Sequence, residues 1–192
     1  MLFRSFGANQ VLPGPFLDAA SVLDLLVSER VTVTAGVPTV WLGVLQELDK
    51  RPGAYDLSCL RAIVIGGSAA PPAMIQGYDR HSIAVMHAWG MTEMTPLGTL
   101  CTVPSSVRDL SPDEQLRYRG KQGTPLPLVE IRARSNGGLV PWDGRTMGEL
   151  EVRGPWVASQ YYNVEGPDDR FTDDGWFRTR SEERRVGKEC RL

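Results

Sequence analysis

Residues 61–72 give the clearest indication of the fold class, and they read Arg-Ala-Ile-Val-Ile-Gly-Gly-Ser-Ala-Ala-Pro-Pro. The apolar run over 61–65 predicts a short buried strand. The small residues after it predict a tight turn, and the two prolines suit the first turn of a helix over 73–80. A strand that passes through a turn directly into a helix is typical of sheets with helical connections, so this stretch indicates an α/β fold.

The sequence around this stretch alternates helix and strand in the same way. Asp18 can cap a helix whose apolar face comprises Ala19, Val22, Leu23 and Leu26. The alternation over 31–35 predicts a strand, and Pro38 opens a second helix whose apolar face comprises Trp41, Val44, Leu45 and Leu48. Another strand over 82–88 ends at residues 89–90. Helices between successive strands imply right-handed crossovers, so we expect a parallel sheet.

The second half of the sequence has a different pattern. Residues 111–114 read Ser-Pro-Asp-Glu, a capping box with proline at the first helical position, and predict a brief helix. Apolar and charged residues then alternate over 129–134 and again over 149–153, with a turn at 135–138. This part is expected to form a small antiparallel sheet or barrel that is polar on one side.

The change of pattern suggests how the chain is organised. We expect a parallel-sheet α/β subdomain over residues 1–105 and a β-rich antiparallel or barrel-like subdomain over 106–179. The tail over 180–192 is densely charged and has no apolar period that would dock it, so we assign it to neither subdomain.

Composition and charge exclude several classes of function. The 192-residue chain is 42% hydrophobic and has a net charge of −2, as in an ordinary soluble globular protein without a basic field for nucleic acid or anionic lipid. Cys59, Cys101 and Cys190 are far apart and lack metal-ligand spacing, which favours a reducing, cytoplasmic location over a disulfide framework or a zinc site. The most apolar stretch, 31–45, falls short of the ~20 residues of a membrane-spanning helix, so no transmembrane segment is expected.

Two segments lie where an open parallel sheet binds its ligands, beyond the carboxyl ends of the strands. The first contains Gly66, Gly67, Ser68 and Ala69. Small residues at a strand end let backbone amides approach a flat or anionic group closely. A tight strand-to-helix turn explains the same residues without a ligand, and this segment alone does not decide between the two interpretations.

The second segment, residues 87–93, reads His-Ala-Trp-Gly-Met-Thr-Glu. Trp89 can stack on a purine face, and Thr92 can donate a hydrogen bond to a phosphate oxygen. Glu93 offers the hard oxygen ligand that Mg²⁺ accepts, usually with waters and substrate phosphates completing the shell. The alternative interpretation is a core tryptophan followed by a solvated Thr-Glu turn.

In combination, these segments resemble motifs of the adenylate-forming, or AMP-binding, superfamily. Residues 66–71 resemble its adenine-binding motif, and residues 89–93, Trp-Gly-Met-Thr-Glu, resemble its Thr-Glu motif. Residues 148–155, Gly-Glu-Leu-Glu-Val-Arg-Gly-Pro, resemble a third signature, and residues 174–179, Asp-Gly-Trp-Phe-Arg-Thr, resemble the start of a fourth. The motifs stand in the family's order, and the resemblance covers residues 6–179.

Within the superfamily, the sequence between the motifs is similar to medium- and long-chain fatty-acid CoA ligases at residues 10–14, 34–41 and 120–123. The resemblance implies part of the N-terminal domain of an acyl-CoA synthetase. Such an enzyme uses ATP and Mg²⁺ to activate a fatty acid as acyl-AMP and then transfers the acyl group to coenzyme A. Enzymes for other carboxylic acids, aryl or amino acids, share the motifs, and an inactive adenine-nucleotide-binding module is a further alternative. The implied partner is a fatty acid or another carboxylic acid, and the resemblance allows a homo-oligomer.

The resemblance also implies roles for the motif residues. The nucleotide-binding set comprises Gly66, Gly67, Ser68, Ala69, His87, Ala88, Trp89, Gly90 and Thr92. Residues 66–69 would line the adenine and the carboxylate end of the substrate, and residues 87–89 would wall the adenine. Thr92 would contact the α-phosphate and Glu93 would bind Mg²⁺, so these two are the candidate catalytic residues. Because two anions must meet, catalysis should rest on positioning and charge neutralisation.

The sequence departs from the family's pattern at three points. Nothing resembles the lysine-bearing phosphate loop or the C-terminal lobe with its catalytic lysine. After residue 179 the family continues with glycine and a ribose-binding aspartate, whereas this chain has Arg180 and Ser181. The tail over 180–192 resembles the in-frame translation of a sequencing adapter. We therefore expect a non-native tail, an internal methionine at Met1, and an isolated chain that is inactive.

Overall fold

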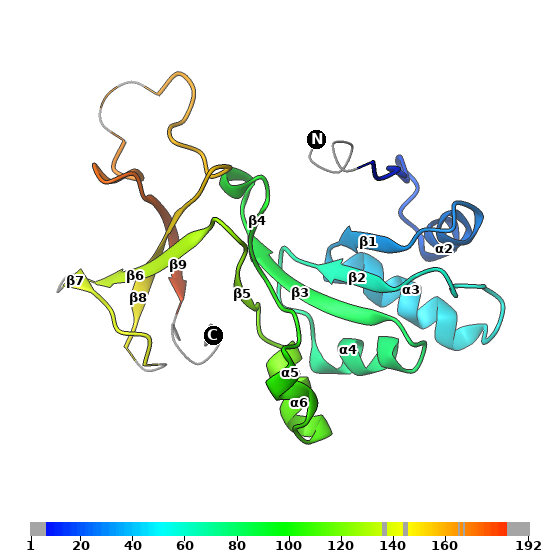
Figure 1. Ribbon diagram of the computed structural model, residues 1–192. Helices are drawn as coiled ribbons and strands as arrows, with labels where there is room; N and C mark the ends of the chain where they lie inside the picture. Colours follow the sequence, from blue (N-terminus) through cyan, green and yellow to red (C-terminus); the bar gives the residue numbers. More distant parts are fainter. Residues whose placement is uncertain (1–6, 136–137, 144–145, 165, 167, 184–192) are drawn as a thin grey trace. The chain divides into compact units, whose positions relative to one another are not determined.

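The computed structural model describes residues 7–183 apart from 136–137, 144–145, 165 and 167 (Figure 1). The chain divides into two compact units, Met1–Val85 and Met86–Leu192. The subdomain boundary expected near residue 105 marks a change in secondary structure and stays a prediction. Of the tail expected to be non-native, residues 184–192 lie outside the described residues, and residues 180–183 belong to a strand.

The first unit has the expected alternation of helix and strand. Its helices are α2 (Ala19–Ser28), α3 (Pro38–Lys50) and α4 (Pro72–Asp79). Its strands β1 (Val33–Gly36) and β2 (Ala62–Ile65) pair in parallel, with Val33 opposite Ala62. The parallel pairing predicted from the helical connections is therefore confirmed for these two strands.

Local sequence signals explain where these helices begin and which faces they bury. The Asp18 side chain accepts a hydrogen bond from the Ser21 amide at 3.0 Å and caps α2. The predicted apolar faces are buried, as shown by Val22, Leu23 and Leu26 of α2 and by Trp41, Val44, Leu45 and Leu48 of α3. Burial of each large aliphatic side chain contributes about 1.5–3 kcal/mol.

A buried tyrosine ties α4 to α3. Tyr78 is fully buried, and its hydroxyl donates a 2.6 Å hydrogen bond to the carbonyl oxygen of Trp41. Desolvation raises the pKa of the Tyr78 hydroxyl well above its usual range, so the hydroxyl stays protonated and remains a donor.

The next three strands along the chain pair with one another in antiparallel direction. Strand β3 (Ala84–Gly90) ends at Gly90, as expected, and pairs antiparallel with β4 (Leu97–Leu100). Strand β4 pairs antiparallel in turn with β5 (Thr124–Pro125). Strand β4 was not expected, because the run 97–100 is short and contains a glycine. The chain reverses between β3 and β4 through a 3₁₀ turn, η1 (Thr92–Met94), followed by Thr95 in the left-handed region. The sheet strands are therefore of mixed direction and not parallel throughout.

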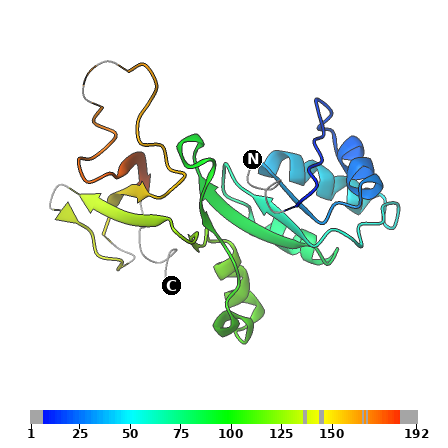
Figure 2. The same ribbon diagram turned by 45° about the horizontal axis from the view of Figure 1, so that its top comes forward.

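Two short helices follow β4. They are α5 (Ser105–Arg108) and α6 (Pro112–Arg119), and they project from the strands in both ribbon views (Figures 1 and 2). The capping box predicted at residues 111–114 is present, since the Ser111 side chain accepts from the Glu114 amide and the Glu114 side chain accepts from the Ser111 amide. Local hydrogen bonding thus sets the start of α6.

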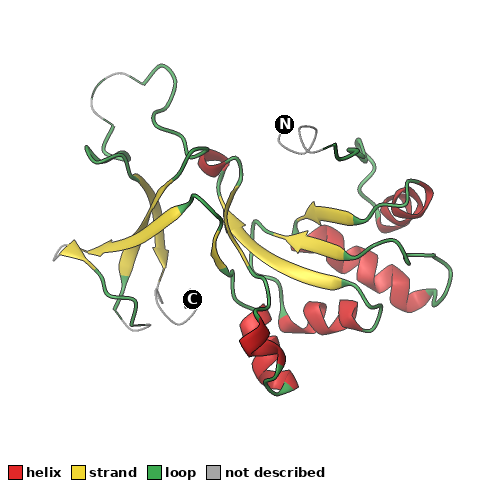
Figure 3. Cartoon of the chain, viewed as in Figure 1, coloured by secondary structure: helices red, strands yellow, loops and turns green. Residues whose placement is uncertain are grey.

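The C-terminal part of the second unit is an antiparallel sheet, as expected. Its strand order is β7 (Gly138–Leu139), β6 (Glu130–Ser135), β8 (Gly148–Arg153) and β9 (Phe177–Glu183). Figure 3 shows only strands and loops in this region, and no helix occurs among its described residues. The predicted alternation places Ala133, Leu150 and Val152 in buried apolar clusters.

One charged residue of this sheet is placed differently from expectation. The alternation predicted a polar side, but Glu151 is fully buried. Its carboxylate forms ion pairs with the guanidinium groups of Arg132 at 2.5 Å, Arg134 at 3.3 Å and Arg178 at 3.5 Å. Arg132 and Arg153 also lie over the Trp176 ring, with their guanidinium carbons 4.1 and 4.7 Å from its centroid. The side chains of Arg132, Arg134 and Arg178 therefore surround the buried carboxylate.

None of the helices in the described part of the chain has both the length and the apolar character needed to cross a membrane.

Candidate active site

The glycine-rich segment lies directly after β2 in the first unit. The Gly66 amide donates to the carbonyl oxygen of Gly36 at 3.2 Å, so the chain leaves the strand without breaking the pairing with β1. Gly67 then has φ of +84°, and an added Cβ there would lie 3.3 Å from the Val37 side chain. Gly67, Ser68 and Ala69 are exposed, which leaves this turn accessible to a ligand. The turn has the conformation that glycine favours.

His87 and Ala88 are buried in β3. Nδ1 of His87 lies 3.1 Å from the carbonyl oxygen of Gly120, and a carbonyl only accepts, so Nδ1 carries the proton of that hydrogen bond. The main-chain oxygen of His87 accepts from the Cys101 amide at 2.7 Å. The His87 ring thus joins β3 to the end of α6. Its expected role in walling adenine stays a prediction.

Trp89 and Gly90 form the end of β3. Trp89 is half-buried and packs against the cluster of Met94, Val152 and Phe177. The pairing with β4 shifts register between Trp89 and Gly90. An added Cβ at Gly90 would overlap the carbonyl oxygen of Pro96, so only glycine fits where the two strands converge.

Thr92 and Glu93 begin the turn that follows. Thr92 is exposed and Glu93 is half-buried, whereas Met94 is fully buried and anchors the turn in the apolar cluster. The Met94 amide donates to the carbonyl oxygen of Met91 at 3.0 Å, and the Thr95 amide donates to that of Thr92 at 3.2 Å. Thr92 therefore lies at the surface, and the next side chain, that of Glu93, is held closer to the core.

A distant segment holds Glu93 at two atoms. The Tyr161 hydroxyl donates a 2.5 Å hydrogen bond to Oε1 of Glu93, and the Ala158 amide donates to its carbonyl oxygen at 2.8 Å. The hydrogen bond to Glu93 is the main reason that the pKa of Tyr161 lies above its usual value, and desolvation adds to it. Tyr161 is therefore a protonated donor toward the carboxylate.

The donor set of this site fits a magnesium ion that is shared with a nucleotide. Glu93 Oε2 accepts no hydrogen bond from the described residues, whereas Oε1 is engaged by Tyr161. No group of three His, Cys, Asp or Glu side chains suited to a metal occurs within the described ranges. Mg²⁺ commonly binds through one or two carboxylates while phosphates and waters complete its shell. A single available carboxylate oxygen, on the residue that follows the exposed Thr92, matches that arrangement.

The predicted residues thus fall into two groups. Trp89, Gly90, Thr92 and Glu93 form one continuous turn of the second unit, whereas residues 66–69 belong to the first unit. Tyr161 was missed by the sequence analysis, because nothing in the loop after the third motif indicates a contact with a residue 68 positions away. Its position shortly after the signature over 148–155 was the only available signal.

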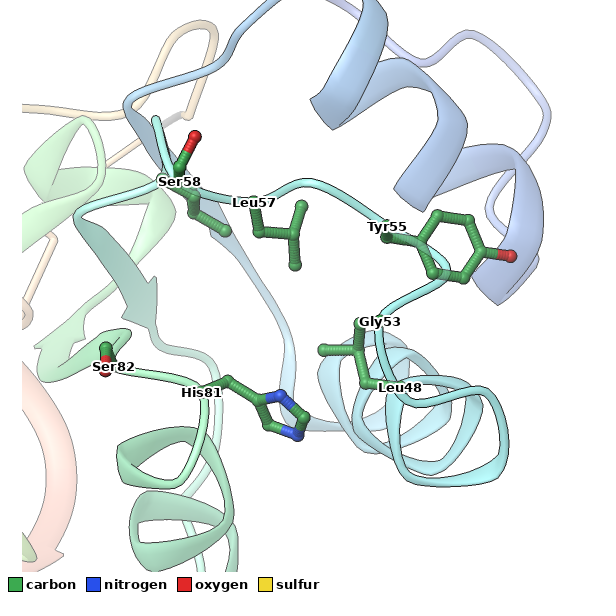
Figure 4. Close-up of a pocket in the computed structure, with 8 residues that line it drawn as sticks. Leu48, Gly53, Tyr55, Leu57, Ser58, His81 and Ser82 are labelled. Carbon is green, nitrogen blue, oxygen red and sulfur yellow. The ribbon is translucent and has the colours of Figure 1, made fainter.

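Figure 4 shows a cavity of the first unit, which has a volume of about 220 Å³. Residues 66–69 of the glycine-rich turn are not among the residues that line it. It is lined by the loop before β2, including Leu57 and Leu60, whereas the glycine-rich turn follows the same strand. His81 and Leu48 also line this cavity, and His81 Nε2 lies 3.3 Å from Asp49 Oδ1. The cavity therefore lies at the amino end of β2, opposite to the strand end at which ligands bind in open α/β sheets.

Comparison with known proteins shows the family to which this chain belongs. The AMP-binding enzyme family matches residues 1–162, and the chain belongs to that family. It is 44% identical over 175 residues to a long-chain-fatty-acid–CoA ligase of Thermus thermophilus, with 90% of this chain and 32% of the relative covered. It is equally 44% identical to a medium-chain-fatty-acid–CoA ligase of Ectopseudomonas oleovorans, with 90% and 31% covered. The chain thus spans about a third of the length of these relatives.

Solved structures with the same fold agree with this assignment. The N-terminal domain of FACL13 from Mycobacterium tuberculosis matches with a TM-score of 0.66 and 28% identity, covering 84% of this chain and 37% of that domain. The O-succinylbenzoate coenzyme A synthetase of Bacillus subtilis, in complex with AMP, matches with a TM-score of 0.67 and 26% identity, covering 84% and 30%. The mixed sheet with helices and the second, antiparallel sheet are therefore those of an acyl-CoA synthetase N-terminal domain.

Proposed function

We propose that this chain is part of an ATP-dependent fatty-acid–CoA ligase and carries part of its nucleotide and acyl site. The observation that supports this proposal best is the turn formed by Thr92 and Glu93. Thr92 is exposed there, and the next residue, Glu93, keeps one carboxylate oxygen without a protein donor among the described residues. The 44% identity to long- and medium-chain fatty-acid–CoA ligases favours a fatty acid as the substrate.

The proposed reaction has two steps. The fatty acid carboxylate attacks the α-phosphorus of ATP, an acyl-AMP forms and pyrophosphate leaves. The thiol of coenzyme A then attacks the acyl carbon and AMP leaves. The first step brings two anions together, so its rate depends on positioning and on neutralisation of charge.

Residues of this chain would contribute to the first step by binding and orientation. The exposed Thr92 hydroxyl is suited to donate to an α-phosphate oxygen, and Glu93 is suited to hold Mg²⁺, which would neutralise phosphate charge. The turn after β2, with Gly67 in a left-handed conformation, offers an exposed main chain to the adenine and to the acyl carboxylate. Trp89 would pack against the nucleotide from the end of β3. These roles are proposals from the motif resemblance and from the site geometry.

A cytoplasmic location belongs to the same proposal, and the motif resemblance allows a homo-oligomer of the longer ligase. The scattered cysteines favour a reducing compartment. Cys101 is buried, and desolvation raises the pKa of its thiol, so it has the character of an unreactive core residue.

The test is an assay of acyl-AMP formation by the longer ligase that carries this sequence. Release of pyrophosphate that requires both ATP and a medium- or long-chain fatty acid, followed by acyl-CoA formation, would support the proposal. Activation of an aryl or amino acid in place of fatty acids would retain the adenylation chemistry and change the substrate. Nucleotide binding without release of pyrophosphate with any acid would show an inactive binding module.

A further inference from the structure

We propose that Tyr161 is a positioning residue for Glu93, and that it holds one carboxylate oxygen so that the other can take a divalent cation. This inference rests on the proposed role of Glu93 as the ligand of Mg²⁺. Its basis is the hydrogen bond from the Tyr161 hydroxyl to Oε1 of Glu93.

The hydrogen bond is part of a longer attachment. We call residues 156–161 the strap. The strap donates to Glu93 from Ala158 and Tyr161, and Nε1 of Trp156 donates to the carbonyl oxygen of Leu97 at 3.0 Å. In the opposite direction, the Thr95 hydroxyl donates to the carbonyl oxygen of Trp156 at 3.0 Å. The strap is therefore bonded along its length to the turn over 93–97, and that turn cannot shift without breaking several of these bonds.

The Tyr161 ring is itself held by aromatic and cationic contacts. Its centroid lies 5.7 Å from that of Phe171 and 6.5 Å from that of Phe177, both in edge-to-face geometry. The guanidinium carbon of Arg170 lies 3.7 Å from the centroid of the Tyr161 ring, and Arg170 is held by Asp168 through a 2.7 Å ion pair. These contacts fix the ring, so the position of its hydroxyl is determined before any ligand binds.

The kind of group that contacts the carboxylate distinguishes Glu93 from Glu151, a glutamate with a purely structural role. Glu151 in the same unit is fully buried and faces a set of guanidinium groups that neutralise it, those of Arg132, Arg134 and Arg178. Glu93 instead receives a neutral hydroxyl, which orients the carboxylate without cancelling its charge. Groups that hydrogen-bond to metal ligands in this way orient them, and their loss costs about 10–100-fold in metal affinity or activity.

The experiment measures how much a divalent cation contributes to nucleotide affinity in the longer ligase. Binding of α,β-methylene ATP is followed by calorimetry once with Mn²⁺ and once with EDTA, because its methylene bridge blocks release of the leaving group and so prevents transfer of AMP to the fatty acid. The dissociation constant in EDTA divided by the dissociation constant in Mn²⁺ measures the contribution of the metal to nucleotide affinity. Tyr161→Phe removes only the hydroxyl and keeps the ring contacts, and Tyr162→Phe is the matched control because Tyr162 is 97% exposed.

We expect Tyr161→Phe to reduce this ratio by about tenfold or more, and Tyr162→Phe to leave it unchanged. A purely structural role would weaken binding equally in Mn²⁺ and in EDTA, and a ratio unchanged in Tyr161→Phe would overturn the inference. Glu93→Gln separates the metal role of Glu93 from the positioning role of Tyr161. If Glu93→Gln lowers the ratio and Tyr161→Phe does not, the metal role of Glu93 stands and the positioning role is wrong. If Glu93→Gln leaves the ratio unchanged, or the unmutated protein shows no metal contribution, the metal role fails and the inference with it.

Discussion

Replacement of the buried Glu151 by glutamine should destabilise the second unit far more than the same change at an exposed glutamate. Glu151 is fully buried among arginine side chains, and that of Arg132 is only 16% exposed. Glu151→Gln keeps the shape of the side chain and removes the buried negative charge that Arg132, Arg134 and Arg178 share, although Arg132 keeps its 2.8 Å ion pair with Asp174. Loss of one partner from a buried pair costs about 3–5 kcal/mol. Because Arg134 and Arg178 are 40% and 39% exposed and can be hydrated, we expect the lower end, about 3 kcal/mol.

Glu130 offers the matched control on the neighbouring strand. Its side chain is 59% exposed and pairs with Arg153 at 2.9 Å, so Glu130→Gln should change stability by no more than about 1 kcal/mol. Urea unfolding of both variants and the unmutated chain, followed by tryptophan fluorescence, gives the comparison, because Trp176 lies against Arg132 and Arg153. Equal losses in the two variants would refute the argument that the burial of Glu151 makes its charge essential.

The remaining predictions concern the site and the first unit. Glu93→Gln in the longer ligase should lower the rate of adenylation, measured as pyrophosphate release, by at least ~10²-fold. Its affinity for a preformed acyl adenylate should change much less. A near-normal rate of pyrophosphate release would remove Glu93 from the mechanism. Gly90→Ala should lower the thermal unfolding midpoint of the chain, because the new Cβ would overlap the backbone of Pro96. Gly43→Ala within α3 should raise the midpoint, because its Cβ would lie 4.0 Å from its nearest neighbour and alanine favours the helix. A higher midpoint for Gly90→Ala than for Gly43→Ala would contradict this packing. The hydrogen bond from the Ser21 amide in the first turn of α2 lowers the pKa of Asp18 below its ordinary value of 3.8. The contribution of the Asp18 carboxylate to stability should therefore be complete above pH 3.8 and should be lost as the pH falls through the lowered pKa of the folded state. The difference in urea midpoint between the unmutated chain and Asp18→Ala should shrink in acid accordingly, and a difference that grows there would have the wrong sign.

The elements that could be predicted from sequence are those set by neighbouring residues. Asp18 and Ser111 cap the first turns of α2 and α6 through residues only three positions away. The apolar face of α3 follows from the helical period alone, and the parallel pairing of β1 and β2 follows from the helix between them. Each of these features is contained in a short window of sequence.

The features that were missed depend on contacts between distant segments. Strand β4 forms because its backbone pairs with β3 and β5, and its short sequence carries little strand preference of its own. Glu151 alternates with apolar residues like a solvent-facing side chain and is buried only because arginines from β6 and β9 cover it. The hydrogen bond from Tyr161 to Glu93 spans 68 residues, and no local pattern encodes it. Periodicity predicts which face a residue occupies, but it does not predict what covers that face.

The strap has a consequence for protein engineering. The Thr-Glu motif reads as a self-contained peptide, yet its carboxylate and its main chain are held by residues 156–161. A graft of residues 89–93 into another scaffold would therefore transfer the side chains without the hydrogen bonds that fix them. A transplant that includes both segments, together with the aromatic support of Phe171 and Phe177, is the smallest piece of this protein that carries the geometry of the motif.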